Sequence, residues 1–94
     1  MILSFRDKRT ARFAAGGRVK DFTGIERAAR LKLDRLEAAT AIGDLAPLPG
    51  NRFEVLKGDR KGKYSIRIND QWRIGFEWPP GAAGPDNVEI VDYH

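Results

Sequence analysis

The sequence predicts a single α+β domain over residues 1–94, with two N-terminal helices packed on one face of a mainly antiparallel sheet of four to five strands. Three observations support this fold class. Apolar side chains recur with helical spacing in the first half, they alternate with a period of two in the second half, and Gly- and Pro-rich segments separate these patterns. A chain of 94 residues is long enough for one hydrophobic core and too short for two.

Two helices are expected in the first half of the chain. A short helix is predicted from about Asp7 to Ala15, where Gly16-Gly17 ends it. The stronger signal extends from Ile25 to Ala39, with Thr23 or Asp21 as the N-cap. The apolar stripe of this second helix consists of Ile25, Ala29, Leu33, Leu36 and Ala39.

Strands are expected at the N-terminus and throughout the second half. Residues 1–5 have the apolar character of a short strand, and alternation with a period of two begins at residue 52. The loops and turns between the later strands are rich in Gly, Pro, Asn and Asp. The later strands are predicted at residues 53–55, 64–68, 72–78 and 88–93.

The hairpin around Asn69 has a register that can be deduced from its apolar residues. A two-residue loop would mix the two faces, whereas a three-residue loop, Asn69–Gln71, pairs Ile66 with Ile74 and buries one consistent apolar face. The same register places Arg67 opposite Arg73, where two like charges repel by a few tenths of a kcal/mol. Such a pair either holds an anion or extends into water, and both interpretations stay open.

The charge of the chain is unevenly distributed. Residues 1–20 hold six bases and one acid, residues 52–73 hold seven bases and three acids, and residues 74–94 hold no Lys or Arg and four acids. The two basic segments suggest a surface for a polyanion such as nucleic acid, and the alternative is ordinary solubility charge. The apolar run at the N-terminus is too short for a signal peptide or a membrane span, so a cytoplasmic protein without a membrane partner is expected.

Few residues in this chain are suited to catalysis. Cysteine is absent and His94 is the single histidine, so neither a transition-metal site nor a cofactor is expected. No P-loop, dinucleotide-binding motif or nucleophile elbow is present. The acid–base groups that remain, His94, Asp92, Tyr93 and Glu54, stand beside the cations Lys57, Arg67 and Arg73 and suit metal-free cleavage of RNA. The alternative for His94 is a mobile chain end or the remnant of an affinity tag.

Three short motifs stand out in the second half of the chain: Leu-Lys-Gly-Asp-Arg at residues 56–60, Asn-Asp-Gln-Trp-Arg-Ile at residues 69–74 and Asp-Tyr-His at residues 92–94. These motifs resemble those of the HigB toxins, which are also called plasmid-maintenance killer proteins and belong to the RelE/ParE superfamily. Residues 1–5 and the Ala-Thr-Ala-Ile-Gly-Asp-Leu run at 39–45 are similar too. The resemblance covers essentially the whole chain.

This resemblance implies a RelE-like fold and a toxin that cleaves mRNA in the A site of the small ribosomal subunit and is neutralised by an antitoxin with a helix-turn-helix domain, as in HigA. It implies an active site on the sheet, with Asp92, Tyr93, His94 and Arg73 as catalytic residues. The residues expected to bind RNA are Lys57, Arg60, Lys61, Lys63 and Arg67. Some family members have a histidine at the position of Glu54, so either Glu54 replaces it as a base or His94 works with less help.

Two other functions compete with RNA cleavage. A ParE-like toxin would poison DNA gyrase, but ParE-like members generally lack the terminal Asp-Tyr-His segment that this sequence contains. A non-catalytic module would use its arginines only to hold nucleic acid or the antitoxin, and His94 would then have no role in chemistry.

Overall fold

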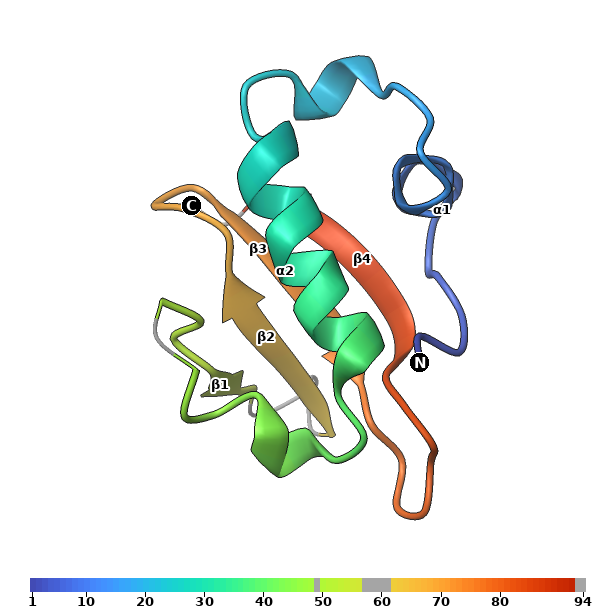
Figure 1. Ribbon diagram of the computed structural model, residues 1–94, viewed down its shortest axis with the longest axis vertical. Helices are drawn as coiled ribbons and strands as arrows, with labels where there is room; N and C mark the ends of the chain where they lie inside the picture. Colours follow the sequence, from blue (N-terminus) through green and yellow to red (C-terminus); the bar gives the residue numbers. More distant parts are fainter. Residues whose placement is uncertain (49, 57–61, 93–94) are drawn as a thin grey trace.

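The computed structural model describes residues 1–48, 50–56 and 62–92 of the chain. Two helices precede a four-stranded antiparallel sheet with the strand order β1-β2-β3-β4, which confirms the predicted α+β class (Figure 1). Two short 3-10 turns, Lys20–Phe22 and Ile42–Asp44, flank the second helix. The helices are α1 (Lys8–Ala14) and α2 (Glu26–Ala38), and the strands are β1 (Glu54–Val55), β2 (Lys63–Arg67), β3 (Trp72–Glu77) and β4 (Asp86–Asp92).

The hydrophobic core lies between α2 and the sheet. Figure 1 shows α2 lying across one face of the strands. All five residues of its predicted apolar stripe are buried, and the sheet contributes the alternating apolar residues of β2 and β3. Trp72 of β3 is only half-buried, and its ring packs edge-to-face with Phe22 at 5.7 Å between centroids. The buried members of the predicted sheet face are Ile66, Ile68, Ile74 and Phe76.

The start of α2 differs from the prediction. The N-cap position is Ile25, which makes no side-chain hydrogen bond to the helix. Thr23 is engaged in the preceding 3-10 turn, where its hydroxyl donates to the carbonyl of Lys20 at 2.7 Å, and Asp21 pairs with Arg9. Neither predicted cap therefore reaches the helix. No helix within the described ranges is both long and apolar enough to cross a membrane.

The predicted strand at residues 1–5 is reduced to a single parallel bridge between Phe5 and Val88. The segment still pairs with the outer edge of β4, since the backbone of Val88 donates to Ser4 at 3.0 Å and accepts from Arg6 at 3.0 Å. Asn87 has a positive φ of 50° and the β3–β4 register shifts at this point, so the strand is irregular where the N-terminal segment pairs with it. The first strand of the prediction is therefore an extended segment rather than a full strand.

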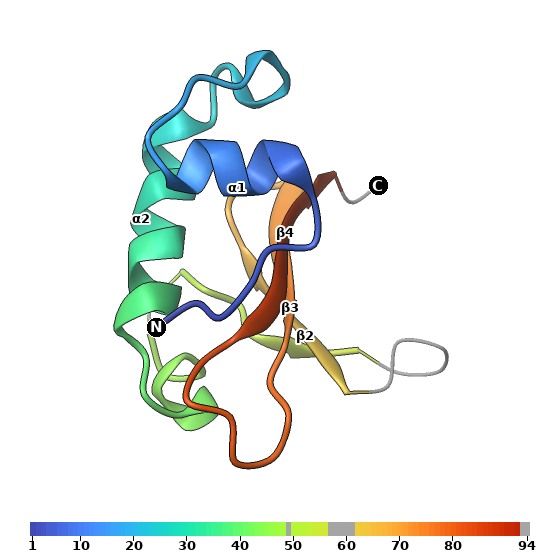
Figure 2. The same ribbon diagram turned by 90° about the vertical axis from the view of Figure 1, so that its right-hand side faces the viewer.

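Helix α1 covers the remainder of the β4 edge (Figure 2). The hydroxyl oxygen of Thr10 accepts a hydrogen bond from the backbone amide of Ile90 at 3.1 Å, and Thr10 is fully buried. Arg9 donates to the carbonyl of the same residue at 3.5 Å. Because an exposed strand edge can pair with another chain, this cover protects the sheet from edge-to-edge association.

The three-residue connection between β2 and β3 is confirmed. Ile66 pairs with Ile74 and Arg67 with Arg73, as the apolar pattern predicts. The side-chain oxygen of Asn69 accepts hydrogen bonds from the amides of Gln71 at 2.9 Å and Trp72 at 2.7 Å, which closes the turn.

Strand β1 is shorter than the strand predicted at residues 53–55. Val55 is exposed because β1 is an edge strand of two residues and α2 does not extend over it (Figure 1). Phe53, in contrast, stacks on Tyr64 at 5.6 Å between ring centroids.

We expect Thr10→Val to destabilise the protein by about 1–3 kcal/mol, because the change keeps the shape of the side chain and leaves the buried amide of Ile90 without an acceptor. Urea denaturation of the variant and the wild type measures the difference. Thr23→Val is the matched control, since the Thr23 side chain is exposed. Equal losses in the two variants would contradict the role given to Thr10.

Candidate active site on the open face of the sheet

The face of the sheet opposite α2 is polar and is not covered by either helix (Figure 2). The period of two that buries Ile66 and Ile74 brings Ser65 and Arg67 of β2 and Arg73 of β3 to this opposite face. The structure therefore confirms the predicted orientation of both arginines.

Arg73 is held in a fixed position on this face. Its Nε donates to the hydroxyl of Ser65 at 2.8 Å, and its Nη2 donates to the carbonyl oxygens of Arg52 at 2.7 Å and Ser65 at 3.4 Å. The side chain is 13% exposed. Within the part of the chain that the structure describes, Nη1 makes no hydrogen bond to protein, so its two N–H groups can still bind an anion.

Arg67 and Arg73 avoid repulsion by using different partners. Arg67 pairs with Asp70 in the turn that follows β2, whereas Arg73 is held by Ser65, Arg52 and Glu54. Neither arginine is simply extended into water. The pair also does not require an external anion for its stability, so the facing arginines alone are weaker evidence for a bound polyanion than the sequence suggests.

Glu54 and Arg73 are brought together from segments 19 positions apart. Glu54 is in β1 and pairs in register with Ser65 of β2. Its Oε2 lies 3.5 Å from Nη2 of Arg73, and the carboxylate remains 55% exposed. A carboxylate that is open to solvent beside a fixed guanidinium is suited to proton transfer next to a bound phosphate.

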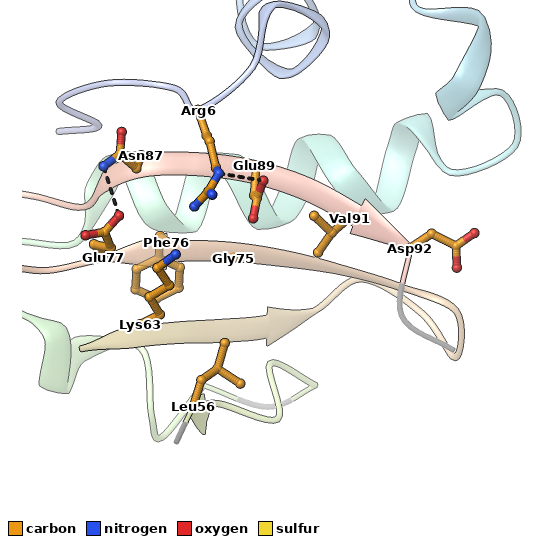
Figure 3. A pocket seen from close by; sticks show the side chains of 10 residues that line it. All are labelled: Arg6, Leu56, Lys63, Gly75, Phe76, Glu77, Asn87, Glu89, Val91 and Asp92. Atoms are coloured by element: carbon orange, nitrogen blue, oxygen red, sulfur yellow. Dashed lines mark hydrogen bonds and ion pairs between the residues drawn. The ribbon is translucent and has the colours of Figure 1, made fainter. Parts of the chain in front are cut away.

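An open groove of about 460 Å³ extends along β3 and β4 on the same face (Figure 3). Its lining includes Gly75, which presents no side chain opposite Glu89. By register, Lys63 lies toward one end of the groove and Asp92 toward the other. Arg6 pairs with Glu89 at 3.5 Å inside the groove, so the groove contains both signs of charge.

Asp92 is in register with Trp72 and accepts a hydrogen bond from Nε2 of Gln71 at 2.9 Å. The preceding residue, Val91, pairs with Arg73. Asp92 thus lies at the Arg73 end of the sheet, two strands away from Arg67 and three from Glu54. The structure brings Glu54, Arg67 and Arg73 close together and sets Asp92 and Lys63 at opposite ends of the groove.

Several predicted site residues lie outside the described residues. The sequence places three of them between β1 and β2 and two immediately after β4. The predictions for them therefore stay predictions. These residues are Lys57, Arg60, Lys61, Tyr93 and His94.

The sequence analysis missed two cations of α2, which lie on the other side of the sheet from the arginine face, the surface that bears Arg67 and Arg73. Lys32 of α2 is buried, and its Nζ donates to Oδ1 of Asn51 at 3.0 Å. Arg35 donates to the same oxygen at 2.9 Å. Burial lowers the pKa of Lys32, and the positive charges of Arg35 and Arg67 lower this pKa further. One signal for Lys32 was present in the sequence, because it lies directly before Leu33 and one helical turn before Leu36 of the apolar stripe.

Among residues 1–48, 50–56 and 62–92, no three His, Cys, Asp or Glu side chains are grouped so that they could hold a metal ion. The expectation of metal-free chemistry stays a prediction.

Comparison with known proteins identifies the family. A family model described as the RelE-like toxin of the type II toxin–antitoxin system HigB matches residues 3–94. The chain belongs to the HigB-like toxin family. As a type II toxin, this HigB-like toxin has an antitoxin as its partner.

Two curated relatives of this HigB-like toxin carry informative names. Toxin HigB-1 of Vibrio cholerae serotype O1 is 44% identical over 85 residues, which cover 88% of this chain and 90% of that protein. Endoribonuclease HigB of Proteus vulgaris is 40% identical over 67 residues, which cover 67% of this chain and 65% of that protein.

We expect the free energy of unfolding to rise as the pH rises from the lowered pKa of Lys32 toward the ordinary value of 10.5. In this window the unfolded chain binds more protons than the folded one, so deprotonation favours the folded state. Urea denaturation at several alkaline pH values should show this contribution in the wild type and its loss in Lys32→Met. Lys8→Met, at an exposed position of α1, is the control for loss of one positive charge. Parallel pH profiles for all three proteins would contradict the prediction.

Proposed function

We propose that this HigB-like toxin is an endoribonuclease that cleaves mRNA in the A site of the small ribosomal subunit, without a metal ion, and so stops translation in the cytoplasm. The observation that carries this proposal is the fixed guanidinium of Arg73 beside the exposed carboxylate of Glu54. Family membership and the name of the Proteus vulgaris relative, Endoribonuclease HigB, support it.

Arg73 supplies the positive charge for the reaction. Its Nε and Nη2 are occupied by Ser65 and Arg52, which fix the plane of the guanidinium before RNA binds. The two N–H groups of Nη1 then donate to a non-bridging oxygen of the scissile phosphate. Because these donors are oriented in advance, they stabilise the extra charge that develops on the phosphate in the transition state.

The proton transfers use a base and an acid on opposite sides of the phosphate. Glu54 takes the proton of the ribose 2′-OH, and the 2′-oxygen attacks phosphorus. The bond from phosphorus to the 5′-oxygen breaks, and His94 protonates this leaving oxygen, as one of a set of acid–base groups that includes Asp92 and Tyr93. The products are a 2′,3′-cyclic phosphate and a free 5′-hydroxyl.

The remaining basic residues bind the RNA backbone. Lys63 lines the groove and Arg67 lies beside Arg73. Basic residues of the segment between β1 and β2 add further phosphate contacts, and positive charge from all of them attracts mRNA largely independently of sequence. These residues are Lys57, Arg60 and Lys61.

The antitoxin is proposed to carry a helix-turn-helix domain and to bind the helical side of the toxin. This side bears α1 and α2, while the open face of the sheet lies away from it (Figure 2). Binding there would leave the arginine face unoccupied, so variants of that face are expected to keep their affinity for the antitoxin.

A translating ribosome extract tests the proposed activity. The wild-type protein should generate new mRNA ends within translated codons, whereas Arg73→Ala should lower the cleavage rate by about 10²–10³-fold because the fixed donors are lost. Arg18→Ala, at an exposed position before α2, is the control for loss of one positive charge. Intact mRNA together with inhibited gyrase supercoiling would instead identify a gyrase poison, and intact mRNA with normal supercoiling a binding module.

Deletion of His94 should lower the cleavage rate by ~10²–10⁴-fold, the usual effect of removing a general acid–base group. Little loss of stability is expected, because the alternating core residues of β4 end at Ile90. Cleavage is measured in the same extract, and thermal unfolding is measured in parallel. A deletion variant that cleaves mRNA at the wild-type rate would show that the reaction depends on Glu54, Lys57 and the arginines instead.

A further inference from the structure

Asn51 connects α2, the loop after it and the sheet. The residue is fully buried. Its Oδ1 accepts from Lys32 and Arg35, and its Nδ2 donates to the carbonyl of Leu45 at 3.1 Å. Its backbone amide donates to Leu48 at 3.3 Å and its carbonyl accepts from the amide of Arg67. Both ends of the side chain and both backbone groups of Asn51 are therefore hydrogen-bonded.

The next residue, Arg52, has a strained backbone conformation. Its φ of 43° lies in the left-handed region, which a residue with a side chain adopts only when its surroundings hold it there. In this conformation the carbonyl of Arg52 accepts a hydrogen bond from Nη2 of Arg73 at 2.7 Å. The backbone strain at Arg52 is therefore coupled directly to the guanidinium of the candidate active site.

We propose that Asn51 is a positioning residue for Arg73. Its hydrogen bonds to α2 and to β2 fix the peptide group between residues 51 and 52. The left-handed conformation of Arg52 then directs the carbonyl of the next peptide group to where it accepts from Nη2 of Arg73. The effect of Asn51 on cleavage rests on the proposed function. Its effect on the orientation of Arg73 does not.

An amide is the side chain that satisfies this position. Two cations donate to Oδ1, while the carbonyl of Leu45 needs a donor, which Nδ2 supplies. Aspartate would keep the acceptor, lose the donor and place a carboxylate against the buried Leu45 carbonyl. Alanine would lose all three contacts and leave Lys32 buried without its hydrogen-bond partner.

The expected defect is partial, because Arg73 keeps other partners. If the Arg52 carbonyl moves, Nε still donates to the hydroxyl of Ser65 and Glu54 still lies beside Nη2. The guanidinium then samples more orientations while the rest of the RNA surface is unchanged. We therefore expect Asn51→Ala to lower kcat by about tenfold with little change in KM, which is the effect of losing roughly one net hydrogen bond in the transition state.

The test combines kinetics with a mutant cycle. Cleavage on mRNA-programmed ribosomes is measured for the wild type, Asn51→Ala, Arg73→Ala and the double variant, each corrected for the folded fraction. If Asn51 acts through Arg73, Asn51→Ala has little further effect in the Arg73→Ala background. Thr10→Val is the control, because it removes a buried hydrogen bond at the other edge of the sheet and should not change kcat per folded molecule.

An NMR measurement gives a readout that needs no activity. The Nη2–H resonance of Arg73, assigned by its absence in Arg73→Lys, should shift and exchange faster with water in Asn51→Ala, because Nη2 is the donor to the Arg52 carbonyl. If the wild type fails to cleave mRNA, the proposed function fails, and this resonance still decides the positioning role. If Asn51→Ala does not fold, Asn51→Asp takes its place in both measurements, with a smaller loss expected. An unchanged resonance, or an equal loss of kcat with and without Arg73, would overturn the proposal.

Discussion

The register between β2 and β3 controls the chemistry of both faces of the sheet. Successive side chains of a strand point to opposite faces, so a shift of β3 by one residue would turn Arg73 toward α2, expose Ile74 and mix the two faces. The oxygen of Asn69 closes a three-residue turn that prevents this shift. The same turn therefore determines which side chains enter the core and which ones face the candidate active site.

The two edges of the sheet differ in how far other segments of the chain cover them. At β4 the N-terminal segment and α1 supply hydrogen bonds to the backbone of Val88 and Ile90, so these groups of the edge are satisfied within the chain. At β1 the strand is only two residues long, and neither helix extends over it. The candidate active site lies toward the β1 edge, where Glu54 can reach Arg73 and solvent at the same time.

Buried polar groups link the stable part of the fold to this site. Lys32, Arg35 and Asn51 form a hydrogen-bonded cluster between α2 and β2, and the carbonyl of the next residue contacts Arg73. Burial lowers the pKa of Lys32, and the nearby positive charges of Arg35 and Arg67 lower it further. If one partner is missing, another buried polar group loses its hydrogen bond, which lowers the free energy of unfolding. The cluster therefore favours the one local geometry in which all its hydrogen bonds are made.

The α+β class, the positions of α2 and the later strands, and the hairpin register could all be predicted from the sequence, because hydrophobic periodicity and turn residues act locally. The same pattern predicted that Arg67 and Arg73 share the polar face. The contacts that hold Arg73 could not be predicted in this way, since Ser65, Arg52 and Glu54 come from different segments of the chain. The same holds for the edge of β4 and the role of Asn51, because hydrogen bonds between distant residues leave no periodic pattern in the sequence.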